Sequence, residues 1–248
     1  EAAAQGLIAG INAALKIKKE KEFILDRSES YIGVMIDDLI TKGVSEPYRM
    51  FTSRAEYRLS LRADNADQRL TPLGIKINLV KKIREKSFLD KQQKLISVYD
   101  ALQSKLISPN VAAKHSVKIA MDGVKRTGVE VLSHNGVTLD NLRKIWDNIP
   151  QFDDKIDEQV KIDAHYSGYL KRQSHDILAF KKDESISIPK DIDYEIFSGL
   201  SNEIKSKLTS IKPKTLGQAL RIDGVTPAAA IILLAFIKKS RYKVSVNE

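Results

Sequence analysis

Five arginines lie close together between residues 46 and 69 of this 248-residue chain. They are Arg49, Arg54, Arg58, Arg62 and Arg69. A guanidinium group is planar and permanently charged, and it can bind a phosphate or carboxylate through two parallel hydrogen bonds. The same stretch adds hydroxyl groups, from Tyr48, Thr52, Ser53 and Tyr57. We therefore predict that these arginines bind the phosphate groups of a nucleic acid or of a cofactor.

The spacing of the arginines allows two interpretations. Arg54, Arg58 and Arg62 are four residues apart, which places them on one side of either a helix or a strand. From residue 57 to residue 62 apolar and polar residues alternate, and this predicts a strand with one apolar and one cationic face. The alternative is a structural network of ion pairs, which stabilise proteins little at a surface. Acidic partners for such pairs lie in the same stretch: Glu46, Glu56, Asp64 and Asp67.

A second group of basic residues surrounds a turn near the C-terminus. Residues 222–228 predict a turn between two helices, the second of which begins at Thr226 and Pro227. The first backbone amides of that helix could face a phosphate group. The basic residues that we assign to this docking surface are Lys212, Lys214, Arg221, Lys238 and Lys239.

Hydrophobic periodicity predicts a mainly α fold that holds both groups in place. The longest predicted helices cover residues 1–20, 31–42, 79–107 and 153–182. Shorter helices are predicted to begin after the capping residues Ser108, Thr138, Ser201 and Thr215. Thr71 followed by Pro72 predicts one further helix start.

Two adjacent aspartates, Asp37 and Asp38, lie in the helix predicted at residues 31–42, which Ser30 would cap. Adjacent side chains on a helix point about 100° apart, so we do not predict a paired general acid and base. We expect one carboxylate to be solvated and the other to pair with an arginine.

The composition excludes several kinds of site. The chain has no cysteine, which excludes disulfides, thiolate nucleophiles and cysteine-ligated metals and fits a cytosolic protein. Its 4 histidines are scattered, so we predict no metal site. No apolar run is long enough to span a membrane. The net charge of +9 favours a nucleic acid or another polyanion as partner, although a solvated lysine-rich surface would give the same charge.

Four segments of the chain, in this order, carry a resemblance to a known family. They are EAAAQGLIAGINAA at residues 1–14, YIGVMIDDL at 31–39, the arginine-rich stretch at 46–67, and SGLSNE at 198–203 together with GVTPAA at 224–229. On these segments the chain resembles the MnmG (GidA) family, the large flavoprotein subunit of a bacterial complex that modifies the wobble uridine of tRNA. The middle of the chain, from about residue 76 to residue 188, matches the family more loosely.

The resemblance implies a function for the whole protein. Together with a GTPase of the MnmE family, it would add a carboxymethylaminomethyl or aminomethyl group to carbon 5 of the wobble uridine, using FAD, NADH and a methylene-donating folate. Gln5 matches a position where the family binds FAD, whereas the glycine-rich dinucleotide-binding motif is absent from this sequence. We therefore expect most of the FAD site to lie in preceding sequence and this chain alone to be inactive. The resemblance also implies a cytoplasmic enzyme that is a homodimer at full length.

We predict four segments along the chain. They are the last helix of an FAD-binding domain at 1–24, an arginine-rich connector at 25–78, an elongated helical domain at 79–195, and a C-terminal helical module at 196–248 that docks the GTPase or tRNA. An alternative is a helical module that binds nucleic acid or a partner without chemistry of its own. A purely structural helical domain would leave the row of arginines unexplained.

Overall fold

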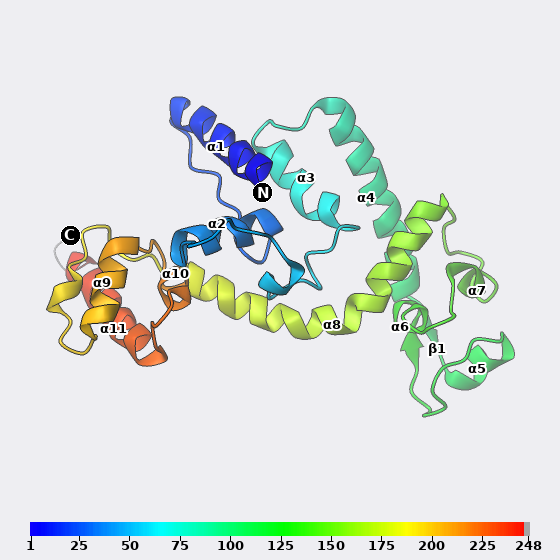
Figure 1. Ribbon diagram of the computed structural model, residues 1–248. Coiled ribbons are helices and arrows are strands. Elements are labelled where there is room, and N and C mark those ends of the chain that lie inside the picture. The colour runs from blue at the N-terminus through cyan, green and yellow to red at the C-terminus, as the bar shows by residue number, and fades with distance from the viewer. Residues whose placement is uncertain (246–248) are drawn as a thin grey trace. The chain divides into compact units, whose positions relative to one another are not determined.

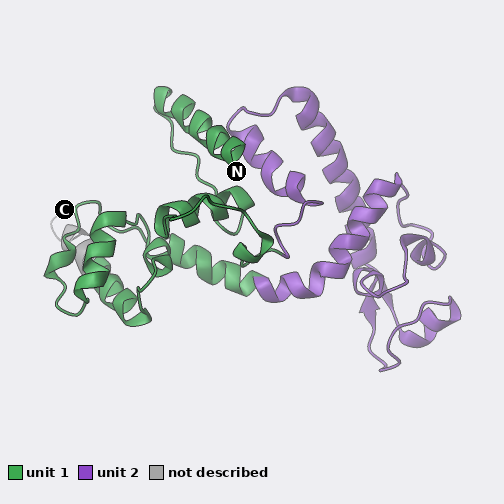
Figure 2. Ribbon diagram, viewed as in Figure 1, with its two compact units in different colours: residues 1–58, 174–248 green, residues 59–173 purple. Residues whose placement is uncertain are grey.

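The computed structural model describes the backbone of residues 1–245 and the side chains of residues 1–237. The chain forms two compact units (Figure 2). The first is built from residues 1–58 and from residue 174 onward, and the second from residues 59–173. Helices dominate both units, which confirms the predicted mainly α fold (Figure 1).

The first unit combines an N-terminal helix pair with a C-terminal bundle. Its helices are α1 (Ala2–Ile17), α2 (Tyr31–Thr41), α9 (Asn202–Ile211), α10 (Leu216–Arg221) and α11 (Pro227–Ser245), with short 3-10 turns at Thr52–Arg54 and Tyr194–Ile196. The C-terminal part of α8 (Asp154–Glu184), from residue 174 onward, also belongs to this unit. Leu208 of α9 and Leu233 of α11 are fully buried in the core of the bundle.

The second unit packs around α4. Its helices are α3 (Ala66–Lys76), α4 (Lys82–Gln103), α5 (Pro109–Lys114), α6 (Gly128–Leu132), α7 (Leu139–Arg143) and the part of α8 up to residue 173. Two short strands, β1 (Leu106–Ile107) and β2 (Arg126–Thr127), pair antiparallel. Its buried core includes Val98 and Leu102 of α4, Leu132 of α6 and Val160 of α8.

Several helix starts follow the predicted capping chemistry. The hydroxyl of Ser30 accepts a hydrogen bond from the amide of Gly33 at 2.9 Å. Helix α2 begins at Tyr31, directly after Ser30. Ser201 and Thr215 cap α9 and α10 in the same way. Thr138 forms a reciprocal capping box with Asn141 at the start of α7. Such caps provide hydrogen-bond acceptors for amide groups that have no partner inside the helix. Because the two residues of each cap lie three positions apart, a cap can be predicted from the local sequence.

Two local predictions are wrong. Residues 57–62 form turns rather than a strand. The predicted helix start at Thr71 and Pro72 is also wrong, because α3 begins at Ala66 and carries Pro72 in its interior. Proline removes one helical hydrogen-bond donor there. The helix continues past it while packing against α4.

No helix in the described part of the chain is both long and apolar enough to cross a membrane.

Gly33 brings α2 close to the backbone of the loop before it. A Cβ atom at this position would clash with the carbonyl oxygen of Asp26 and lie 2.7 Å from that of Leu25. We predict that Gly33→Ala lowers the free energy of unfolding by about 1–3 kcal/mol, because the backbone must move. A matched change, Gly168→Ala in α8, meets nothing within 4 Å and should be neutral or stabilising by up to about 1 kcal/mol. Urea denaturation measures both, and equal effects of the two changes would contradict the prediction.

Candidate functional site

A buried arginine, Arg27, organises the loop before α2. Only 2% of its surface is exposed. Its Nη1 donates to Asp38 at 2.7 Å, to Asp37 at 3.2 Å and to the carbonyl oxygen of Val34 at 3.2 Å. Its Nε and Nη2 each donate a hydrogen bond to the carboxylate of Glu56, at 3.2 and 2.7 Å. One guanidinium group therefore binds three acidic side chains from α2 and from the arginine-rich stretch.

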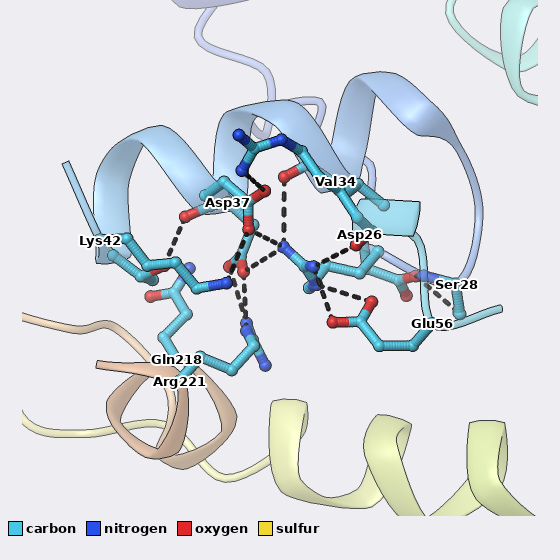
Figure 3. Close-up of polar contacts among 12 residues, drawn as sticks. Asp26, Ser28, Val34, Asp37, Lys42, Glu56, Gln218 and Arg221 are labelled. Atoms are coloured by element: carbon cyan, nitrogen blue, oxygen red, sulfur yellow. Dashed lines mark hydrogen bonds and ion pairs between the residues drawn. The ribbon is translucent and has the colours of Figure 1, made fainter. Parts of the chain in front are cut away.

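A second arginine brings the C-terminal bundle to the same acidic pair. Arg221, the last residue of α10, donates from Nε and Nη2 to the two oxygens of Asp37, both at 2.7 Å. Its Nη1 donates to Glu184 at the end of α8, at 2.5 Å. Figure 3 shows Asp37 and Arg221 facing each other, with Glu56 on the other side of the cluster. Asp37 is thus shared by two arginines that lie 194 positions apart in sequence, at 27 and 221.

The surroundings of Asp38 favour its ionised form. Burial alone would raise the pKa of Asp38, but hydrogen bonds from Arg27 and from the hydroxyl of Tyr48 hold that pKa below its usual range. Lys42 adds an ion pair to Asp38 at 3.3 Å. Burial and the bond to Asp38 raise the pKa of Tyr48 to about 12, so its hydroxyl stays protonated and donates.

The expectation that one of the two aspartates is solvated is wrong. Asp37 and Asp38 are 7% and 2% exposed, and both bind Arg27. A buried carboxylate held by fixed cations cannot readily accept a proton from a substrate. We therefore assign the cluster formed by Arg27, Asp37, Asp38, Glu56, Glu184 and Arg221 a structural role and call it the arginine–carboxylate network.

Three arginines of the predicted phosphate-binding row are exposed. Arg49 and Arg58 have exposed side chains and form no ion pair with the described residues. Arg54 is 40% exposed, lies over the ring of Tyr48 at 4.6 Å, and donates from Nε to the carbonyl oxygen of Arg49 at 2.9 Å. Its Nη1 also forms an ion pair with Asp38 at 3.9 Å. The guanidinium groups of Arg49 and Arg58 therefore remain the more available to an anionic ligand.

The other two arginines of the row are committed to contacts within the second unit. Arg62 binds Asp64 through Nε and Nη2, both at 2.9 Å, binds Asp163 of α8, and lies over the ring of Tyr166 at 4.6 Å. Arg69 donates from Nη2 to the carbonyl oxygen of Arg62 at 3.0 Å. The unit boundary falls between Arg58 and the following residue, so Arg62 and Arg69 belong to the second unit and the other three arginines to the first.

The pKa values of the two acidic partners of Arg62 are shifted in opposite directions. Burial raises the pKa of Asp163, despite bonds from Gln159 and Arg62. It acts in the same direction on Asp64, but hydrogen bonds from Arg62 and Gln159 outweigh it, so the pKa of Asp64 is lowered.

The predicted basic docking surface is only partly available to a partner. Lys212 and Lys214 are exposed, and Lys214 forms an ion pair with Glu22 at 3.1 Å. The guanidinium of Arg221 is engaged by the network, so it cannot bind a phosphate while those bonds hold. The side chains of Lys238 and Lys239 lie outside the described residues.

The predicted cofactor residue, Gln5, is exposed in the first half of α1. A Cβ atom at Gly6 or Gly10 of the same helix would meet nothing within 4 Å. Within the described residues, no three histidine or acidic side chains are grouped so that they could hold a metal ion.

Comparisons with known proteins assign the chain to a family. Residues 82–174 match the tRNA modifying enzyme MnmG/GidA C-terminal helical domain, and residues 176–248 match the MnmG/GidA C-terminal helical bundle. The chain belongs to the MnmG/GidA family. The first match ends at residue 174 and the second begins at residue 176, close to the division of the compact units within α8, between residues 173 and 174.

Individual relatives agree with this assignment. The tRNA uridine 5-carboxymethylaminomethyl modification enzyme MnmG of Caldicellulosiruptor saccharolyticus is 44% identical over 97% of this chain and 39% of its own length. The protein of the same name from Pelobacter propionicus is 46% identical over 96% of this chain and 38% of its own length. A crystal structure of Aquifex aeolicus GidA superimposes with a TM-score of 0.81 at 39% identity, over 95% of this chain and 37% of that one. The chain therefore spans about two fifths of the length of these MnmG relatives.

Sequence reasoning missed two central members of the network in this MnmG-family chain. Arg27 lies in a charged segment that reads as a linker, and Glu184 ends a long polar helix. The available signal was the adjacent pair Asp37 and Asp38 on an otherwise apolar helix. Buried carboxylates need cations, so this pair predicts arginine partners without saying which ones.

We predict that Arg27→Met lowers the free energy of unfolding by about 3–5 kcal/mol, because it leaves buried carboxylates without their cation. The control is Arg58→Met, at an exposed arginine that forms no ion pair with the described residues. That change should stay within about 0.5 kcal/mol of the parent. Chemical denaturation compares them, and a small effect at residue 27 would contradict a structural role for the network.

The lowered pKa of Asp38 predicts a pH dependence of stability. Because the pKa is lower when folded, Asp38 stabilises the protein fully above its unfolded value of about 3.9, and this contribution is lost as the pH falls through the folded value. We predict that Asp38→Asn lowers stability at neutral pH and flattens its decline below about pH 4. The control is Asp147→Asn, at an exposed aspartate, which should leave the decline unchanged. Denaturation midpoints across pH measure this, and an unaltered acid decline in Asp38→Asn would contradict it.

Proposed function

We propose that this chain is part of a flavoenzyme that modifies carbon 5 of the wobble uridine in tRNA. The activity for which its relatives are named, tRNA uridine 5-carboxymethylaminomethyl modification, supports this proposal. The chain's own contribution is to bind the tRNA and to dock an MnmE-type GTPase, in a cytoplasmic enzyme that is a homodimer at full length.

The observation that carries the tRNA-binding role is the division among the arginines. Arg49, Arg54 and Arg58 are exposed on the first unit, whereas Arg62 is 9% exposed at its side chain and held by two carboxylates. A structural network would engage all of them, but Arg49 and Arg58 form no ion pair with the described residues. Exposed guanidinium groups of this kind suit the phosphates of a polyanion.

FAD is the cofactor that we propose for the whole protein. Helix α1 of this chain would form one part of its binding site. Gln5 is exposed, and the face of α1 that carries Gly6 and Gly10 has open space in the described structure. The side-chain amide of Gln5 can both donate and accept a hydrogen bond, and the glycines let a flat group come close. A bound flavin would supply hydride and one-carbon chemistry, with NADH and a methylene-donating folate as co-substrates.

The exposed arginines give the proposal a direct test in the full-length protein. We predict that Arg58→Ala weakens tRNA binding and reduces the slope of log affinity against log salt by about 0.7–0.9, because one phosphate contact is lost. The matched change Arg62→Ala should instead lower the melting temperature and leave the slope unchanged, because Arg62 is bound by Asp64 and Asp163.

Filter binding across salt concentrations, together with thermal melting, separates the two outcomes. The same slope for Arg58→Ala and the parent protein would contradict a phosphate contact at Arg58. Wobble-uridine modification by the full-length protein, assayed on the same tRNA, tests the activity itself. Absence of modification in the presence of FAD, NADH, folate and GTPase would contradict the proposed reaction.

A further inference from the structure

A turn in the second unit contains a pair of residues that the proposed function does not use. Asn135 is the only asparagine in this sequence that is followed by a glycine, Gly136. Both residues are exposed, and they lie in the turn between α6 and α7. Gly136 has a φ of 77°, in the left-handed region that glycine adopts without strain. A Cβ atom at Gly136 would meet nothing within 4 Å, so the space beside this peptide bond is open.

Two groups that can react with each other are both unbonded in this turn. The backbone amide of Gly136 donates no hydrogen bond to the described residues, and the side-chain amide of Asn135 forms none with them either. A backbone amide that is bonded elsewhere must first give up that bond, at a cost in free energy, before its nitrogen can attack a side chain. Glycine also has no side chain to shield its nitrogen. Exposure, open space and two unbonded groups therefore coincide at one peptide bond.

Comparable positions in the same unit lack one or more of these features. Asn148 is exposed, but the next residue is the β-branched Ile149, whose amide donates to the carbonyl oxygen of Trp146 at 3.3 Å. Asp122 precedes a glycine, but its carboxylate accepts two hydrogen bonds from Arg126, at 3.0 and 2.6 Å. These bonds lower the pKa of Asp122 and favour its ionised form, and an ionised carboxylate is a poor electrophile.

We propose that Asn135 is a site of spontaneous deamidation. The backbone nitrogen of Gly136 attacks Cγ of Asn135, the bond between Cγ and the side-chain nitrogen breaks, and that nitrogen leaves as ammonia with the proton of the Gly136 amide. The product is a cyclic imide. Water then opens the ring at either carbonyl carbon, which gives aspartate or isoaspartate. Water is the only co-reactant, and the proposal does not depend on the proposed function.

The residues on either side of Asn135 make the change in the main chain consequential. The carbonyl oxygen of His134 accepts a hydrogen bond from the ammonium group of Lys161 at 2.7 Å. Val137 is 4% exposed in the core of the second unit, and its amide donates to the same carbonyl oxygen at 3.4 Å. Isoaspartate lengthens the main chain by one carbon between these two anchored residues. The modification therefore disturbs the turn and lowers the stability of the second unit as the protein ages.

Incubation of the full-length protein in neutral and in alkaline buffer tests the proposal. Peptide mapping by mass spectrometry should detect the mass change from amide to acid at Asn135 at least an order of magnitude faster than at Asn148. The conversion should be faster in alkaline buffer, because removal of the proton from the Gly136 amide precedes the attack. Asn135→Gln keeps a side-chain amide but needs a larger ring, so this variant should stay unmodified.

Melting temperatures test the consequence for stability. The incubated parent protein should melt at a lower temperature than fresh protein, whereas Asn135→Gln should not change on incubation. Freshly prepared Asn135→Asp adds the charge without lengthening the main chain, and because the position is exposed it should melt like the fresh parent.

Each outcome bears on the inference. Release of ammonia together with isoaspartate at residue 135 in the parent, and neither in Asn135→Gln, supports the deamidation site. Conversion at Asn135 that is no faster than at Asn148, or that proceeds equally in neutral and alkaline buffer, would overturn it. A loss of melting temperature that Asn135→Gln shares with the parent would overturn the link between this modification and the stability of the second unit.

Discussion

The structure of the first unit depends on ion pairs that compensate for buried charge. Moving an ion out of water costs several kcal/mol of solvation free energy even after the protein relaxes, and only close, hydrogen-bonded partners offset that cost. Arg27 has almost no exposed surface, so it requires Asp37, Asp38 and Glu56 around it. Asp37 in turn requires both Arg27 and Arg221. The loop before α2, α2 itself, the arginine-rich stretch and α10 are therefore held by one set of mutually dependent contacts (Figure 3).

Ion pairs within the chain also separate the arginines into two kinds. Arg27, Arg62 and Arg221 are fully committed to carboxylates of the same chain. Arg49 and Arg58 are exposed. The carbonyl oxygen of Arg49 accepts a hydrogen bond from the side chain of Arg54, and this bond restricts the backbone that carries Arg49. Fixing part of the chain by internal ion pairs leaves the remaining cations in defined positions, which a phosphate-binding surface needs.

Local chemistry explains which parts of this fold could be predicted from sequence. Ser30, Thr138 and Ser201 cap helices through bonds to amides three residues away, so their effect is visible in a short window. The Asp37–Arg221 pair joins residues 184 positions apart, and nothing local distinguishes Arg221 from the surrounding lysines. The predicted strand at residues 57–62 failed for a related reason. Alternation fits a half-buried strand, but a strand also needs a partner, and none of the described strands pairs with this segment. Instead Leu61 is buried and Tyr57 packs edge-on against Phe180 at 5.7 Å.

The most direct test of this account is a double-mutant cycle on Asp37 and Arg221, using Asp37→Ala, Arg221→Ala and the combined variant. If the pair couples α2 to the C-terminal bundle, the effects on the free energy of unfolding should be non-additive by about 1–3 kcal/mol. The exposed pair Glu203 and Lys207, at 2.7 Å within α9, provides a matched cycle that should show little coupling. Additive effects at Asp37 and Arg221, to within about 0.5 kcal/mol, would contradict the central role of the network.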